Sequence, residues 1–123
     1  MKPSSCKAKG RQLQNAVAGL VREWFGLSED DCRPAVMGET GADLKLSSAA
    51  KRAFPFAVEC KKQEALNIWQ ALKQAEENAA VEGLHPALVF QRNRSKAYAV
   101  VPLATWLEMA AAYTREEGTE VRF

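Results

Sequence analysis

The stretch FAVECK, residues 56–61, decides how the rest of the chain is interpreted. Side chains along a β-strand alternate between its two faces, so Glu59 and Lys61 should share one face while Cys60 points into an apolar core. Pro55 is compatible with this strand because proline is tolerated at a strand's start. The stretch therefore predicts a strand that is apolar on one side and ends with an acid and a base on the other.

Helical patterns flank this strand in the sequence. Residues 12–25 place apolar side chains at helical spacing until Gly26 ends the pattern. Residues 65–82 predict a long helix terminated by Gly83, and residues 103–113 predict a last helix. The inward faces of these two helices are expected to carry Ile68, Trp69, Leu72, Ala75 and Ala79, and Leu103, Trp106, Leu107 and Ala110, respectively.

Further strands are predicted at residues 34–37, 43–46, 87–90 and 98–101. The strand 43–46 is expected to form a hairpin with 56–61, which places Asp43 beside Glu59. The long helix before strand 87–90 predicts a right-handed crossover between parallel neighbours. The expected fold class is α/β, more exactly α+β: a central mixed sheet flanked by helices, in the order α-β-β-β-α-β-β-α.

Length and composition narrow the class of protein. A chain of 123 residues, 47% of them hydrophobic, predicts one domain over residues 1–123, with a flexible basic N-terminus at 1–8 and a C-terminal tail at 114–123. The 17 basic and 15 acidic side chains give a net charge of only +2, so attraction to a polyanion must come from local clusters. Three cysteines without close pairing, no signal sequence and no apolar span predict a reduced, soluble, cytoplasmic protein.

The residues Asp43, Glu59 and Lys61 together suggest phosphodiester hydrolysis. That reaction needs a divalent cation, an activated water and neutralisation of charge on the phosphate oxygens. Two carboxylates can hold the cation, with the backbone carbonyl of Cys60 as a third oxygen ligand. The ammonium group of Lys61 can orient or deprotonate the water, or lie against the phosphate. The alternative explanation is an exposed cross-strand ion pair.

The pattern of Asp43 followed by Glu59-Cys60-Lys61 resembles the PD-(D/E)XK nuclease superfamily, although the proline of that name is absent. The nearest resemblance is to small archaeal and phage-type Holliday-junction resolvases, through Lys9-Gly10-Arg11, Glu59-Cys60-Lys61 and Gln74-Ala75, and it spans roughly residues 9–101. It implies a restriction-endonuclease-like core and Mg²⁺ bound by Asp43 and Glu59, with Mn²⁺ as a substitute. It also implies that Lys61 assists the nucleophile and that Gln74 supports the site. No organic cofactor is expected.

One position departs from the resemblance. Many such resolvases carry a glutamate on the first helix as a metal-site acid, and the comparable residue here is Gln14, a poorer cation ligand. Either fewer anionic groups hold the metal, or Glu39 or Glu23 compensates, or activity is weak.

A polar stripe follows the motif on the helix at 65–82. It consists of Asn67, Gln70, Gln74 and Asn78, at helical spacing. Such amides can bind phosphate oxygens without repelling DNA. An ordinary solvated helix face explains Gln70 and Asn78 equally well, and explains Gln74 less well given the resemblance.

Two basic clusters are candidates for phosphate contacts, although either alone is better explained as solvated surface. The first contains Lys2, Lys7, Lys9 and Arg11, and the second contains Arg92, Arg94 and Lys96. The predicted DNA contacts are Lys7, Lys9, Arg11, Arg92 and Arg94.

The single histidine, the three tryptophans and Cys60 are expected to have structural roles. His85, the single histidine, is expected in a turn before Pro86 with no catalytic role. Trp24, Trp69 and Trp106 lie on apolar helix faces and are expected in a core or an interface before they serve as base-stacking platforms. Cys60 has no histidine partner, so it is not expected to act as a nucleophile.

Three functions remain open. The first is a structure-selective endonuclease for branched DNA, acting in recombination or repair as a homodimer because one site per chain cuts one strand. The second is a nickase or repair exonuclease with the same site. The third is a catalytically weak or inactive nucleic-acid- or protein-binding module of the same fold, which Gln14 favours. No membrane partner is expected.

Overall fold

The computed structural model describes residues 3–116 and contains two small sheets and four helices in that range. The elements are α1 (Pro3–Phe25), β1 (Cys32–Pro34), β2 (Leu44–Leu46), α2 (Ser48–Ala53), β3 (Phe56–Lys62), α3 (Ile68–Glu82), β4 (His85–Gln91), β5 (Tyr98–Val100) and α4 (Leu103–Glu116). Helices flank strands that pair both parallel and antiparallel, so the predicted α+β class is confirmed.

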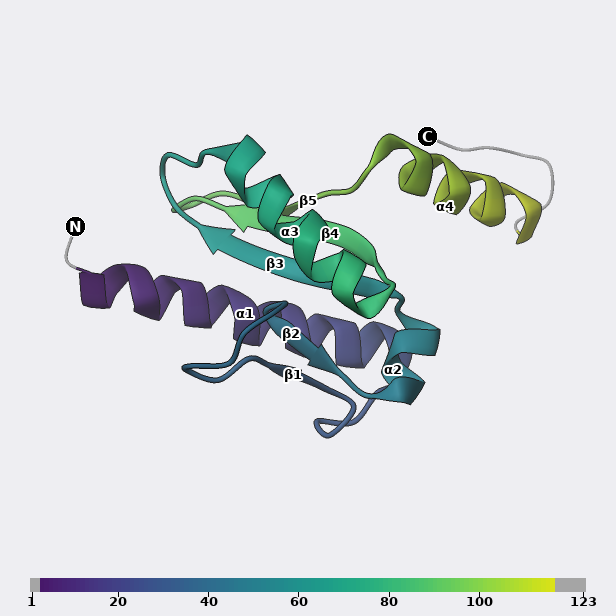
Figure 1. Cartoon of the computed structure of the whole chain (residues 1–123), viewed down its shortest axis with the longest axis horizontal. Helices are drawn as coiled ribbons and strands as arrows, with labels where there is room; N and C mark the ends of the chain where they lie inside the picture. The colour runs from purple at the N-terminus through teal and green to yellow at the C-terminus, as the bar shows by residue number, and fades with distance from the viewer. Residues whose placement is uncertain (1–2, 117–123) are drawn as a thin grey trace.

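The larger sheet has the strand order β3-β4-β5. As predicted, β3 and β4 run parallel, joined by the crossover helix α3, and β5 adds antiparallel to β4. Figure 1 shows α1 and α3 on opposite sides of this sheet. Buried side chains agree with this view: Val58 clusters with Leu13 of α1, whereas Ala57 clusters with Ala79 of α3.

The predicted hairpin between residues 43–46 and 56–61 is wrong. β2 pairs with β1 in a separate two-stranded antiparallel sheet, and the short helix α2 lies between β2 and β3 in the chain. The side chain of Ser47 caps α2 by accepting a hydrogen bond of 3.1 Å from the N–H of Ala50, which is fully buried. A short helix of this kind carries too few turns to show in an apolar pattern, and the element order becomes α-β-β-α-β-α-β-β-α.

Several predicted core residues are exposed. Trp24 and Trp69 are each 80% exposed, and the α4 residues Leu103, Trp106 and Leu107 are 66%, 57% and 53% exposed. On α3 the predicted Ala75 and Ala79 are buried, and Ala71 joins them on the inward face in place of Trp69. Apolar periodicity identifies residues that share a helix face, but it does not say whether the same chain supplies a surface to cover that face.

The ends of some elements also differ from the predictions. α1 begins at Pro3 and takes in most of the expected N-terminal tail, while α4 continues through residues expected in the C-terminal tail. His85 lies in β4 rather than in a turn, with its ring centroid 5.6 Å from that of Phe56. Lys2 and residues 117–123 lie outside the described part. Among the described helices, none combines the length and the apolar character needed to cross a membrane.

Candidate active site

Glu59 lies in the middle of β3 and is only 2% exposed. Its neighbours Val58 and Cys60 belong to the core cluster with α1, so the Glu59 side chain faces the opposite side, toward α3. There its Oε1 accepts a hydrogen bond of 2.9 Å from the Nδ2 amide of Asn78. A buried carboxylate with one amide donor is an unusual residue for a strand interior and marks β3 as the centre of the site.

Asp43, the residue immediately before β2, contacts the same strand. Its backbone N–H donates to the carbonyl of Val58 over 2.9 Å, and its Oδ2 accepts from the N–H of Cys60 over 2.7 Å. In extended strands the N–H and C=O of one residue point to the same side. The carbonyl of Cys60 therefore points to the edge of β3 where Asp43 lies.

Both acids cost free energy to ionise. Burial and the nearby negative charge of Asp43 raise the pKa of Glu59 to about 7, and Lys61 only partly opposes this. Burial also raises the pKa of Asp43, against the hydrogen bond from Cys60 and the charge of Lys61. The same burial and acids raise the pKa of the Cys60 thiol, which keeps it neutral and supports the view that it is no nucleophile.

Lys61 follows Glu59 on the same face of β3 and lines a polar cavity of about 200 Å³. The other polar residues around this cavity are Gln63, Asn67, Gln70 and Gln74. Gln74 thus lines the same cavity as Lys61. Among the described hydrogen bonds, however, the one that reaches Glu59 comes from Asn78, one turn further along α3. Asn67 caps α3 by accepting from the N–H of Gln70 over 3.2 Å.

Two residues of this site were not singled out from the sequence. For Asn78 the stripe left a solvated helix face and a site role equally open, although its helical phase relative to the buried Ala71, Ala75 and Ala79 marks it as the stripe member nearest the core. Lys45 is the second, because its charge lowers the pKa of both Asp43 and Glu59. The signal for it was the sequence Asp43-Leu44-Lys45, which repeats the acid-x-lysine spacing of β3.

A second cavity, of about 600 Å³, is lined in part by Asp43. It is lined by Lys7, Arg11 and Gln14 of α1 and by Glu39. The structure thus brings Gln14 to the site, and it brings two of the predicted DNA contacts there as well. Glu39 is held by Arg33 through hydrogen bonds of 2.7 and 3.1 Å, which lower its pKa to about 2, so this acid is already paired.

The remaining predicted residues lie further from the two acids. Lys9 and Glu23 belong to α1 but do not line the cavity at Asp43. Arg92 lines a cavity of about 500 Å³ beyond the end of β4. Arg94 is exposed in the turn after it, with a left-handed φ of 61°.

The donor set fits one hard divalent cation. Asp43 and Glu59 supply carboxylates, and the Cys60 carbonyl points to their edge, which gives the oxygen ligands that Mg²⁺ prefers. No cluster of three histidine, cysteine or acidic side chains that could hold a metal ion occurs among the residues described, so a cation bound here would need this carbonyl and water as further ligands. Two carboxylates whose mutual repulsion raises a pKa are also the groups that a cation would relieve.

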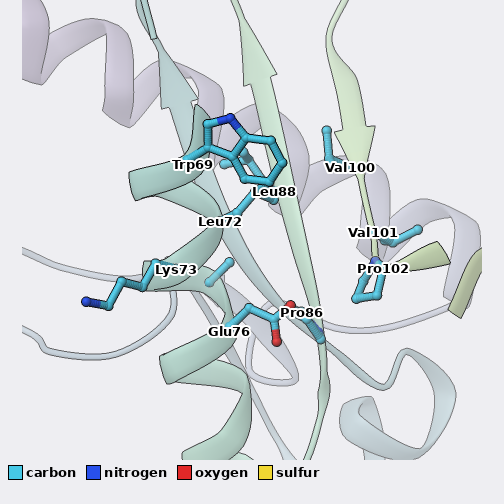
Figure 2. Close-up of a pocket in the computed structure, with 10 residues that line it drawn as sticks. Trp69, Leu72, Lys73, Glu76, Pro86, Leu88, Val100, Val101 and Pro102 are labelled. Carbon is cyan, nitrogen blue, oxygen red and sulfur yellow. The ribbon is translucent and has the colours of Figure 1, made fainter. Parts of the chain in front are cut away.

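A further groove, which neither acid lines, is mainly apolar. Figure 2 shows Trp69 and Leu72 of α3 projecting toward Leu88 of β4, with Val100 and Pro102 on the far wall. Its volume is about 300 Å³, and its two charged members, Lys73 and Glu76, lie on α3. This groove lacks the convergent acids of the candidate active site.

Residues 5–120 match the family described as "Phage putative PDDEXK endonuclease". No curated protein and no solved structure matches the chain significantly. The match covers nearly the whole sequence, including Asp43, Glu59 and Lys61. The chain therefore belongs to the phage PDDEXK endonuclease family and, with it, to the PD-(D/E)XK nuclease superfamily.

Proposed function

We propose that the protein is a metal-dependent DNA endonuclease whose site consists of Asp43, Glu59 and Lys61, with the Cys60 carbonyl as an additional metal ligand. The observation that carries the proposal is the approach of two carboxylates from segments distant in the chain, close enough that the charge of Asp43 raises the pKa of Glu59, beside a lysine on the strand of Glu59. Because the chain belongs to a nuclease family, we assign phosphodiester hydrolysis to this cluster.

Different residues are proposed to bind the metal, to position the acids and to act on the water or the phosphate. Asp43 and Glu59 bind the cation, Mg²⁺ or in its place Mn²⁺, which supplies charge neutralisation and lowers the pKa of water. Asn78 fixes the Glu59 carboxylate and Asp43 is fixed by the N–H of Cys60, so both are held before substrate arrives. The Lys61 ammonium lies on the same face as Glu59, where it orients the attacking water or contacts the scissile phosphate.

Branched DNA is the substrate we favour. Basic side chains line two cavities: Lys7 and Arg11 line the one that contains Asp43, and Arg92 and Lys96 line one beyond the end of β4. Contacts to phosphates on both sides of a cleavage point read the shape of DNA rather than its base sequence. The resemblance to Holliday-junction resolvases supports the same substrate.

The experiment compares nicking of a four-way junction and of a linear duplex with Mg²⁺ and with Mn²⁺. The wild type should cut the junction faster, and Asp43→Asn, Glu59→Gln and Lys61→Ala should each lose most of the activity. Glu77→Gln and Lys62→Ala are matched controls, since these residues line none of the cavities described here. Equal rates for all preparations would reject the enzymatic assignment, whereas a preference for linear duplex would favour the nickase or exonuclease.

We further propose that two copies associate through one continuous apolar surface. The groove in Figure 2 ends at Val101 and Pro102, and α4 begins at the next residue with Leu103, Trp106 and Leu107 exposed. A symmetric dimer buries the same patch from both copies. It would also supply the two sites needed to cut two strands of a junction.

A further inference from the structure

The strand register extends from the proposed catalytic lysine to two aromatic residues. Lys61 of β3 is the partner of Phe90 on β4, and Phe90 is the partner of Tyr98 on β5. Paired residues on neighbouring strands point to the same face of a sheet. Lys61, Phe90 and Tyr98 therefore form one row across the sheet, and Tyr98 ends it at the edge strand.

The cavity at the end of this row, called here the Tyr98 cavity, has a volume of about 500 Å³. Its lining includes Gln63, Leu66, Phe90, Arg92, Lys96 and Tyr98. Gln63 and Leu66 also line the cavity that contains Lys61. The two cavities thus share a wall, and a strand of DNA leaving Lys61 along the sheet would enter the Tyr98 cavity.

The aromatic pair has the form of a stacking platform. The rings of Phe90 and Tyr98 lie 6.0 Å apart between centroids at an interplanar angle of 28°, in a stacked arrangement. Tyr98 is 56% exposed, so Phe90 supports its ring while much of its surface remains open to solvent. An exposed aromatic ring held in a fixed orientation suits stacking of a nucleobase, which every base can provide.

The basic side chains of Arg92 and Lys96 and an ordered turn complete the lining of the Tyr98 cavity. The Ser95 hydroxyl donates to the carbonyl of Arg92 over 3.0 Å and accepts from the N–H of Arg92 over 3.1 Å. The Gln91 amide donates to the carbonyl of Ser95 over 2.9 Å. These bonds fix the backbone that carries Arg92 and leads to Lys96. Glu64 also lines the cavity, but the two cations outnumber it.

We propose that the Tyr98 cavity binds an unpaired nucleotide close to the cleavage point, with its base stacked on Tyr98 and its phosphate contacted by Arg92 or Lys96. Two strand spacings separate Lys61 from Tyr98, or roughly 10 Å between their Cα atoms. DNA carries one phosphate per roughly 3.4 Å along each strand of a duplex. The bound nucleotide therefore lies about two or three positions from the scissile phosphate. This inference rests on the proposed function, because it assumes that DNA passes Lys61.

The consequence is a preference for DNA with unpaired nucleotides at a branch or fork over continuous duplex. A paired base is stacked between its neighbours and cannot reach the platform without being extruded, which costs free energy. The preference should therefore depend on the aromatic ring at position 98 and be absent for fully paired DNA.

The test is equilibrium binding of fluorescent DNA in EDTA, where no cleavage occurs. Forked DNA with three unpaired nucleotides is compared with a duplex of the same sequence. Tyr98→Ala should weaken binding of the fork about 5- to 150-fold, the range for loss of one stacked base. It should change duplex binding less than about twofold.

Two control variants accompany this measurement. Tyr98→Phe retains the ring and should bind both DNAs as the wild type does. Trp24→Ala removes another exposed aromatic residue that lines none of the cavities described here, and it is the matched control.

A second measurement does not depend on a variant that folds. The wild type is irradiated with forked DNA that carries 5-bromouracil at one unpaired position, and the attached peptide is identified by mass spectrometry. Attachment at Tyr98 or Phe90 supports the proposal. Attachment only elsewhere, or equal fork binding by Tyr98→Ala and the wild type, overturns it. Nuclease activity with Tyr98-independent binding would reject the stacking site alone, whereas Tyr98-dependent binding without any cleavage would reject the catalytic assignment alone.

Discussion

The carboxylate of Asp43 accepts a hydrogen bond of 2.7 Å from the backbone N–H of Cys60, and this contact holds the acid that precedes β2 against the strand that carries Glu59. The N–H of Asp43 is bound in turn to the carbonyl of Val58 over 2.9 Å. β2 and β3 are separate in the chain and belong to different sheets. These two bonds therefore bring the acids together where no regular hairpin does.

The double role of Asp43 predicts that two substitutions will separate stability from activity. Asp43→Asn keeps an oxygen that can accept from the N–H of Cys60, so its unfolding free energy in EDTA should stay near that of the wild type. Asp43→Ala leaves this half-buried N–H without its partner and should lose about 1–3 kcal/mol in urea denaturation. Both variants should lose nicking activity with Mg²⁺. Equal stability of the two variants would show that the bond to Cys60 does not hold the sheets together.

The raised pKa of Glu59 predicts that the metal-free protein becomes less stable as pH rises. The folded-state pKa of about 7 exceeds the ordinary value of 4.5. The stability that the protonated acid contributes is therefore complete below pH 4.5 and is lost as pH rises through about 7. This loss is on the order of 3 kcal/mol from the size of the shift. Asp43, whose pKa is also raised, acts in the same direction.

Thermal denaturation in EDTA between pH 5 and pH 8 measures this effect. Glu59→Gln should remove most of the fall in stability, because an amide does not titrate. Mg²⁺ added at pH 8 should raise the Tm of the wild type and leave that of Glu59→Gln nearly unchanged. A wild-type protein whose stability does not fall between these pH values would contradict the burial of an ionisable Glu59.

Asn78 is predicted to act as a positioning residue through Glu59. The hydrogen bond that its side-chain amide donates favours the charged form of the Glu59 carboxylate. Asn78→Ala should therefore raise the pKa of Glu59 further and move the acid limb of the pH–activity profile to higher pH. Activity should recover in part at alkaline pH. Gln74→Ala, the position favoured by the resemblance, serves as the comparison and should leave the pH profile in place. A shift caused by Gln74→Ala alone would reverse this assignment.

The shared face of Glu59 and Lys61 could be predicted because it depends on local sequence, whereas Asp43 was expected beside Glu59 through a hairpin that the structure does not contain. An acid and a base that end an apolar strand are visible in a few residues, and the strand's alternation determines which side chains share a face. The parallel pairing of β3 and β4 followed from the long helix between them, for the same kind of reason.

Features that depend on contacts between distant segments could not be predicted in this way. The separation of the two sheets depends on α2, whose capping serine gives a signal only a few residues long. The choice of Asn78 over Gln74 depends on the rotation of α3 about its axis, which the pattern gives only approximately. The exposure of Trp106 depends on whether any other surface covers α4, and a single chain's sequence pattern carries no information on this point.

The exposed face of α4 predicts a dimer that a single charge should disrupt. Trp106→Asp puts a carboxylate in the middle of this apolar face and should convert the dimer to monomer. The Tm of the monomeric protein should change little, because the side chain at this position is already exposed. Size-exclusion chromatography with light scattering at tens of micromolar measures the mass. Glu108→Gln, on the same helix, is the control and should remain dimeric. A monomeric wild type would reject the interface.

The basic side chains beside Asp43 predict a defined dependence of DNA binding on salt. Lys7 and Arg11 line the cavity that contains Asp43, where a phosphate on the α1 side of the cleavage point would lie. Each phosphate contact releases counterions and contributes about 0.9 to the slope of log affinity against log salt concentration. The double variant Lys7→Ala/Arg11→Ala should therefore flatten this slope by roughly 1.8 on duplex DNA between 50 and 200 mM salt.

The control is Arg52→Ala, which removes an exposed basic side chain of α2 that lines none of the cavities described here. Its slope should match that of the wild type. If the double variant and Arg52→Ala gave the same slope as the wild type, DNA would have to approach the two acids from another side, and the cavity beside Gln14 would not be part of its path.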